Sequence, residues 1–223
     1  MSTKIKLDII SDVVCPWCLI GYKRLEQAIS ELGIQDQIEI SWQAFELNPN
    51  MPMEGEDILD HVKRKYGSSP EQWRNSQTNM IKLGKEIDFT FEFAEGKRIV
   101  NTRDAHILLA YAKESGKQTE LKMRLFEAYF SKSKNVSNRE VLLEEIKNIG
   151  LDTNVANERL ENNDSRKQLI DEEDFWRKKG ISSVPTIVFN RSSSLTGAQS
   201  VSVYKQVLAD LLNHNHLSKI QQN

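Results

Sequence analysis

The first forty residues follow a strand, helix, strand pattern. Residues 4–10 alternate between apolar and polar side chains, and residues 37–43 do so again. Between them, apolar residues recur at steps of four and three from Cys18 onward, until Gly33 interrupts the pattern. Alternation indicates a strand, and the steps of three and four indicate a helix. Two strands joined by one short helix are usually parallel neighbours in a sheet.

The end of the chain returns to the strand pattern after a long helical stretch. From about residue 58 to residue 179 the apolar residues keep helical spacing. VPTIVFN and SLTGAQ then predict two short strands, and a closing helix follows around residues 204–211. Neither end carries enough strands to bury a sheet alone, so the two ends must meet. The sequence therefore predicts one α/β domain with a helical insertion.

Three local signals mark helix boundaries inside the insertion. Pro70 in SSPEQW suits a first helical turn, and Ser137 and Glu140 have the spacing of a capping box. Gly150 suits a helix end.

Charge and hydropathy exclude several kinds of partner. The chain has 30 Lys and Arg against 32 Asp and Glu, a net charge of -2, with both signs mixed along its length. This composition predicts no nucleic-acid partner. No stretch is apolar and long enough to cross a bilayer, and charges interrupt the first residues as they would not in a signal peptide. If the chain is complete as written, we expect a cytoplasmic protein without membrane contact.

Cys15 and Cys18 are the only cysteines, and they lie where the first strand gives way to the helix. The spacing suits a metal clip, a disulfide staple or a reaction centre. A staple closing so short a loop would contribute little, and lasting disulfides are rare in the cytosol. Disulfide exchange needs an attacking thiolate and a second thiol that resolves the mixed disulfide. The pair supplies both.

The position of each cysteine predicts its role. Cys15 should stand at the helix N-terminus, where the backbone N–H groups would lower its pKa below about 8.5. Cys18 lies on the apolar stripe, so we assign Cys15 as the nucleophile and Cys18 as the resolving thiol. Pro16 suits the first helical turn. Trp17 is an apolar neighbour without charge, which favours a less oxidising couple than a cationic histidine at that position would give.

Six motifs, in this order along the chain, carry a resemblance to a known family. They are CPWC at 15–18, FELNP at 45–49, NTRDAH at 101–106, LFEAYF at 125–130, ISSVPTIVFN at 181–190 and LTGAQ at 195–199. With them the sequence resembles the DsbA-like thioredoxin-fold proteins, specifically the FrnE-type thiol-disulfide oxidoreductases. The resemblance implies a thioredoxin fold interrupted by a large all-helical insertion. Residues 1–48 and 166–223 would form the thioredoxin part, and residues 49–165 the insertion domain.

The resemblance also implies how the site works. It predicts oxidoreductase or isomerase activity through a mixed disulfide at CPWC, and a cis bond before Pro185 opposite the cysteines. Such a bond would leave the backbone of Val184 free to pair with an extended substrate. The substrates would be thiols or disulfides, of protein or small molecules. No bound cofactor is expected beyond the redox-active Cys15–Cys18 disulfide, with glutathione as a candidate co-substrate, and the protein would be a monomer or homodimer.

Two carboxylates precede the motif. Asp8 or Asp12 could accept a proton from the resolving thiol if it were buried. A helix cap or a solvated strand end is the interpretation that we favour for both.

A zinc site is the first alternative function. Cys15 and Cys18 could join His214 and His216, which form an HxH near the C-terminus, since structural zinc usually has four such ligands. His61 and His106 are the remaining histidines. A frayed helix end explains HNH more simply, so we expect no metal.

Two further alternatives remain. One is a different enzyme class on the same fold, and the other is a binding module without thiol chemistry. Glutathione-dependent isomerases and kappa-class transferases also resemble the chain at NTRDAH and LNP, but they usually carry serine where Cys15 stands. A docking module would use Met51, Met53 and Trp73 as exposed contacts, although core or loop packing accounts for the same residues.

Overall fold

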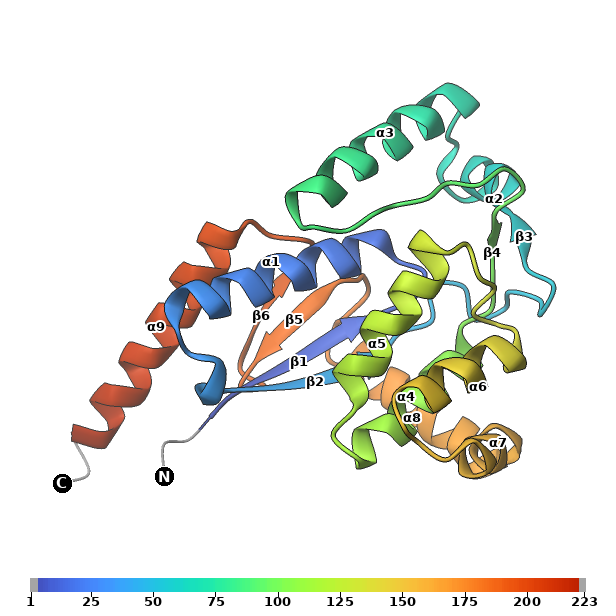
Figure 1. Cartoon of the computed structure of the whole chain (residues 1–223). Coiled ribbons are helices and arrows are strands. Elements are labelled where there is room, and N and C mark those ends of the chain that lie inside the picture. The colour runs from blue at the N-terminus through green and yellow to red at the C-terminus, as the bar shows by residue number, and fades with distance from the viewer. Residues whose placement is uncertain (1–3, 221–223) are drawn as a thin grey trace.

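The two ends of the chain form one sheet in the computed structural model, which describes residues 4–220. The strand order is β2 (Ile38–Ala44), β1 (Ile5–Ser11), β5 (Thr186–Phe189) and β6 (Ser193–Thr196). β1 pairs with β2 in parallel and with β5 antiparallel, and β5 pairs antiparallel with β6. Figure 1 shows these strands at the centre, with both chain ends on the same side of the molecule. The predicted meeting of the two ends is confirmed.

Helix α1 (Pro16–Leu32) begins and ends where the sequence predicts. Pro16 occupies the first turn, and Gly33 ends the helix with φ of 65°, a left-handed conformation that glycine adopts without a Cβ clash. A short 3-10 turn (Gln35–Gln37) then leads into β2. α1 packs against the closing helix α9 (Val201–Ile220). The sheet and these two helices form the thioredoxin part of the chain.

Most of the remaining elements lie between β2 and β5 in the chain and form two groups. The first group is β3 (Glu56–Asp57), α2 (Ile58–Tyr66), α3 (Pro70–Glu86) and β4 (Arg98–Ile99). The second group is α4 (Arg103–Glu114), α5 (Gln118–Phe126), a π-helical turn (Glu127–Ser131), α6 (Arg139–Asn148), α7 (Thr153–Glu161) and α8 (Asn163–Lys178). Figure 1 shows α2 near the start of α1, α3 above α1, and α4 to α8 bundled at one end of the sheet.

The helical pattern of the sequence missed a pair of short strands and placed one helix N-cap a residue too early. β3 and β4 pair antiparallel inside the region where the sequence predicts helices. Strands of two residues are too short to show a periodicity. The N-cap of α6 is Asn138, not Ser137, because the Asn138 side chain accepts from the backbone N–H groups of Glu140 and Val141. Pro70 begins α3 as predicted, and Ser69 and Gln72 form a capping box there.

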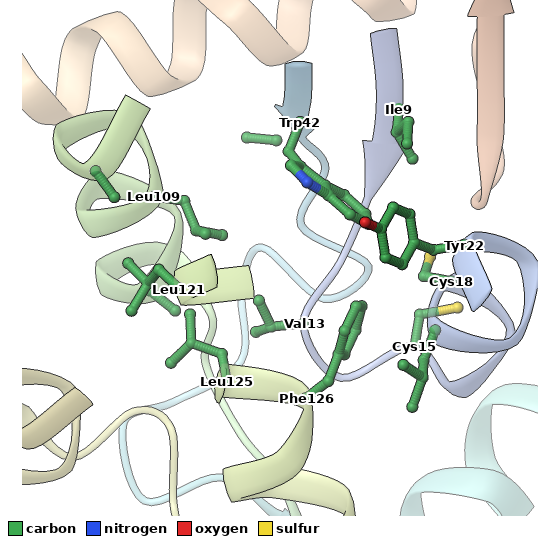
Figure 2. Close-up of a cluster of buried hydrophobic side chains, with 14 of the residues drawn as sticks. Ile9, Val13, Cys15, Cys18, Tyr22, Trp42, Leu109, Leu121, Leu125 and Phe126 are labelled. Atoms are coloured by element: carbon green, nitrogen blue, oxygen red, sulfur yellow. The ribbon is translucent and has the colours of Figure 1, made fainter. Parts of the chain in front are cut away.

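The insertion and the thioredoxin part share one hydrophobic core. The ring of Trp42 on β2 lies 4.8 Å from that of Tyr22 on α1 and 6.3 Å from that of Phe126 on α5. Figure 2 shows these aromatic rings beside Leu121 and Leu125. Buried apolar surface contributes about 25 cal/mol per Å², so this contact ties the segments together. Whether residues 1–48, 49–165 and 166–223 act as separate domains stays a prediction.

Two hydrogen bonds join the place where the chain enters the insertion to the helix by which it leaves. The backbone N–H of Ala44, at the end of β2, donates to Oε1 of Glu172 at 2.9 Å. The backbone N–H of Glu46, two residues further along the chain, donates to Oε1 of Glu173. Both acceptors lie on α8, so the carboxylates satisfy backbone groups at the end of the strand. None of the described helices is long and apolar enough to cross a membrane.

Candidate active site

Both cysteines lie at the start of α1. Cys15 is the N-cap residue, and its backbone N–H donates to the carbonyl of Asp12 at 3.3 Å. Cys18 lies in the first turn, and its N–H donates to the carbonyl of Cys15 at 3.1 Å. The side chain of Cys15 is 5% exposed and that of Cys18 is fully buried. Figure 2 shows the two residues next to the aromatic core.

The two thiols influence each other, and this corrects the predicted pKa of Cys15. A hydrogen bond to Cys18 and burial raise the pKa of Cys15 well above its usual value. Burial opposes ionisation of Cys18, but hydrogen bonds from Cys15 and Ser11 and the nearby charge of Lys122 lower its pKa. The expectation of a low pKa at Cys15 is therefore wrong. The pair holds its proton on the outer sulfur, and the anion is favoured on the inner one.

The loop before β5 forms the opposite side of the site. The peptide bond between Val184 and Pro185 is cis, and the Cys15 thiol donates to the Val184 carbonyl at 4.0 Å. Helix α1 reaches this loop closely at Gly21, where an added Cβ would lie 3.3 Å from Cγ of Pro185 and from Cα of Ala198. Glycine at this position lets the helix that carries the cysteines touch the loop.

A groove of about 360 Å³ opens beside Cys15. Pro16, Trp17 and Val184 line it together with residues of α2 and α3, whereas Cys18 does not line it. Trp17 is 40% exposed. The structure thus brings together five of the six predicted site residues at or next to this groove, and Cys18 lies behind them.

A buried contact between a carboxylate and an imidazole lies behind the cysteines. Oδ1 of Asp12 lies 3.3 Å from Nε2 of His106, and Oδ2 accepts from the backbone N–H of Leu47 at 2.8 Å. Burial opposes ionisation of Asp12, but the hydrogen bond and the charge of His106 lower its pKa. The interpretation of Asp12 as a cap or solvated carboxylate is wrong. Asp8 is also buried, and it accepts from Gln43 Nε2 at 2.5 Å.

Two polar residues beside Cys18 carried no signal in the sequence. Lys122 on α5 is 1% exposed, and its ammonium lies 5.2 Å from the ring of Trp42 and 5.0 Å from that of Phe126. Burial lowers its pKa to about 8, against the opposing effect of Cys18 and Asp12. The Ser11 hydroxyl has no hydrogen-bond partner other than Cys18 among the described side chains. In the sequence, a lysine on a helix is normally expected to reach solvent. The burial of Lys122 becomes evident only when the neighbouring strand is seen to pack beside α5.

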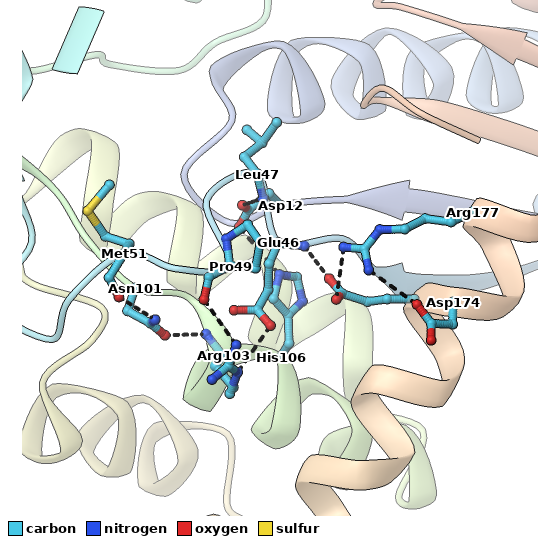
Figure 3. Close-up of polar contacts among 11 residues, drawn as sticks. Asp12, Glu46, Leu47, Pro49, Met51, Asn101, Arg103, His106, Asp174 and Arg177 are labelled. Carbon is cyan, nitrogen blue, oxygen red and sulfur yellow. Dashed lines mark hydrogen bonds and ion pairs between the residues drawn. The ribbon is translucent and has the colours of Figure 1, made fainter. Parts of the chain in front are cut away.

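The NTRDAH motif supports the site without lining the groove, whereas FELNP does both, because Leu47 and Asn48 are among the lining residues. Asn101 Nδ2 donates to the carbonyl of Met51 at 2.8 Å, and Arg103 Nε lies 3.2 Å from Oε1 of Glu46. Arg103 also donates to the carbonyl of Pro49 at 3.1 Å. Figure 3 shows these bonds around His106 and Asp12. They hold the segment after β2 against the start of α4.

The alternative functions find limited support. Among residues 4–213, whose side chains are described, no cluster of three or more His, Cys, Asp or Glu is placed to hold a metal ion. The side chains of His214 and His216 lie outside this part. Of the contacts expected for a docking module, Met51 is buried, Met53 is 56% exposed and Trp73 lines the groove beside Cys15.

Residues 6–209 match the family model of the DSBA-like thioredoxin domain, which covers most of the chain. The chain belongs to this family. YwbO of Bacillus subtilis is 26% identical over 210 residues, which cover 92% of this chain and 96% of YwbO. Among solved structures of DsbA-like proteins, a probable DsbA oxidoreductase from Streptomyces coelicolor has a TM-score of 0.87 and 26% identity. That match covers 94% of this chain and 90% of the other.

A more distant member shares the fold alone. The cytosolic disulfide reductase DsbM from Pseudomonas aeruginosa, solved with GSH, has a TM-score of 0.63 and 16% identity over 93% of this chain and 99% of its own. The DsbA-like fold with a helical insertion is thus confirmed, and so is membership of the DsbA-like family, whereas the FrnE-type branch stays a prediction.

Proposed function

We propose that the protein is a thiol-disulfide oxidoreductase in which Cys15 attacks and Cys18 resolves. The Cys15 thiolate attacks one sulfur of a substrate disulfide, the substrate S–S bond breaks, and one substrate thiolate leaves. The Cys18 thiolate then attacks Cys15 Sγ and releases the second substrate thiolate. The substrate gains two electrons and two protons, and the protein ends as the Cys15–Cys18 disulfide. The reverse sequence oxidises a dithiol.

The different exposure of the two sulfurs is the observation that carries this proposal. Cys15 lines the groove and Cys18 does not, so a substrate sulfur can reach only Cys15. The hydrogen bond between the two thiols gives the Cys15 proton a path to Cys18, and its transfer would leave the nucleophilic thiolate at the outer position. The Val184 carbonyl, 4.0 Å from Cys15 Sγ, supports a role for the Val184–Pro185 segment in binding the substrate backbone.

A small thiol is a reasonable recycling partner. DsbM, which shares the fold, was solved with GSH, and this supports glutathione as the co-substrate of this chain. The same comparison supports a cytoplasmic location. A glutathione-dependent isomerase or kappa-type transferase on this fold is the other candidate, but a second cysteine behind Cys15 favours dithiol chemistry.

Single cysteine variants test the assignment. We expect Cys15→Ser to abolish insulin reduction, and Cys18→Ser to accumulate a mixed disulfide that non-reducing mass spectrometry detects. Ser200→Ala, an exposed change outside the site, is the control. Full insulin reduction by Cys15→Ser, or glutathione conjugation that needs neither cysteine, would contradict the proposal.

A further inference from the structure

Six aromatic side chains line the groove beside Cys15. Those of Trp17, Tyr66, Trp73, Phe93, Tyr129 and Phe130 line it, and its volume of about 360 Å³ is in the range of small-molecule sites. Aromatic surfaces of this kind bind flat apolar groups by stacking and edge contacts. The disulfide exchange proposed above needs no such lining.

The far wall of the groove belongs to the insertion. Trp73 on α3 lies edge-on to Phe93, with ring centres 5.9 Å apart and an interplanar angle of 88°. Met80 of the same helix and Tyr66 of α2 line the groove with it. In Figure 1, α2 and α3 lie across from the start of α1, which carries Cys15. The insertion thus builds a fixed apolar wall opposite the reactive sulfur.

One buried cation faces this aromatic lining. The Lys97 side chain lines the groove, is 8% exposed, and donates to the carbonyls of Tyr129 at 2.9 Å and Glu92 at 3.1 Å. An ammonium has three donors, so one is left over, and the ring centres of Tyr129, Phe130 and Phe93 lie 4.6, 5.4 and 5.6 Å from the same nitrogen. The lining residues include no Asp or Glu among the described part of the chain. The Glu92 carboxylate supports the charge of Lys97 without lining the groove.

We propose that this groove binds a small aromatic disulfide that carries an anionic group, with its sulfur at Cys15 and its anion at Lys97. The inference rests on the proposed exchange chemistry and names its substrate class. In one turnover the disulfide is reduced to two thiols, while Cys15 and Cys18 together lose two electrons and form the protein disulfide.

Single-turnover kinetics with the reduced protein test this inference. The probes are 5,5′-dithiobis(2-nitrobenzoate), which is aromatic and anionic, 4,4′-dithiodipyridine, which is aromatic and neutral, and hydroxyethyl disulfide, which is neither. We expect the rate with the anionic aromatic probe to saturate with concentration. The rate with hydroxyethyl disulfide should rise linearly.

Two variants separate the aromatic wall from the cation. Trp73→Ala should raise the half-saturating concentration of both aromatic probes about tenfold and leave hydroxyethyl disulfide unchanged. Lys97→Met keeps the apolar stem and should weaken only the anionic probe, again about tenfold. Phe175→Ala, an exposed aromatic on α8, and Lys147→Met, on the exposed face of α6, are matched controls outside the groove.

Linear rates with all three probes, or equal effects of Trp73→Ala on each, would overturn the groove assignment while leaving the exchange chemistry intact. So would a disulfide-bonded peptide that reacts faster than the aromatic probes and is slowed by Trp73→Ala, because the groove would then serve polypeptides. Failure of hydroxyethyl disulfide to react at all would instead refute the proposed function. If Lys97→Met does not fold, comparing the anionic probe with its carboxamide on the wild-type protein decides the role of the cation.

Discussion

Replacing Lys122 by methionine should stabilise the reduced protein at pH 7. Methionine keeps the length of the side chain and removes a charge that is 1% exposed. Buried charges are costly unless they are paired, and an apolar residue of similar volume is often tolerated better.

The pKa of Lys122 sets the size of the effect. Burial lowers this pKa from 10.5 to about 8, and each pKa unit corresponds to about 1.4 kcal/mol. Keeping the ammonium charged in the folded state therefore costs about 3 kcal/mol below pH 8. The contacts of the ammonium with Trp42 and Phe126 offset about 1 to 2 kcal/mol. We expect a net gain of about 1 to 2 kcal/mol in the free energy of unfolding.

The pH dependence identifies the cause. The unfolded chain holds the Lys122 proton more tightly than the folded chain does, so the cost disappears as the pH rises from about 8 to 10.5. Urea unfolding of both proteins, kept reduced, at several pH values between 6 and 10.5 measures the difference. The variant should be more stable at pH 7 and lose that advantage by pH 10.5.

A second measurement tests the effect of Lys122 on the thiols. Loss of the nearby cation should raise the pKa of Cys18, so the thiolate absorbance of the reduced pair should appear at higher pH in the variant. Lys147→Met, on the exposed face of α6, is the control. A variant less stable than wild type by 1 kcal/mol or more at pH 7, on the order of one buried hydrogen bond, would refute the reasoning.

Three further substitutions test the packing around the site. Asp12→Ala should cost about 2 to 4 kcal/mol, because it leaves the Leu47 N–H and His106 without a partner. Since the pKa of Asp12 is lowered, this cost should be present at pH 7 and shrink as the pH falls below 4. Urea unfolding at pH 7 and pH 3 measures it, and an equal cost at both would contradict this reasoning. Gly84→Ala should destabilise by about 1 to 3 kcal/mol, because its Cβ would clash with the Phe89 carbonyl and lie 2.8 Å from the Phe91 ring; a thermal melt against Lys82→Ala measures it, and a rise in Tm would refute it. Leu125→Ala should cost about 2 to 5 kcal/mol in the same assay, and a loss below 1 kcal/mol would mean that the shared core adjusts.

The sequence predicted the sheet because its signals are local. Alternation marks β1 and β2, and Gly33 ends α1 where the apolar stripe stops. The meeting of β1 with β5 followed from the need to bury both ends, but their antiparallel direction was not predicted. The pair β3 and β4 escaped notice, since two residues cannot establish a period and their pairing spans 40 residues of chain.

The sequence predicted where the two sulfur atoms lie, but it did not predict the charges and hydrogen bonds that shift their pKa values. The position of Cys15 at a helix N-terminus gave the correct place but the wrong direction for its pKa. A helix N-terminus lowers the pKa of a thiol that stands there by itself, whereas at Cys15 the hydrogen bond to Cys18 and burial raise the pKa. The groups that favour the Cys18 anion include Lys122, which comes from the insertion more than a hundred residues away. Only the folded arrangement brings that charge to the motif.

The two carboxylates of α8 that hold the end of β2 define where the insertion could be exchanged. Glu172 and Glu173 bind the backbone N–H groups of Ala44 and Glu46, and backbone donors are present whatever side chains a relative carries. A chimera that keeps these glutamates and takes residues 47–171 from another family member would preserve the junction, provided that the donor supplies an aromatic ring against Trp42. The redox pair could in this way be fitted with different grooves, and its substrate range altered without touching the cysteines.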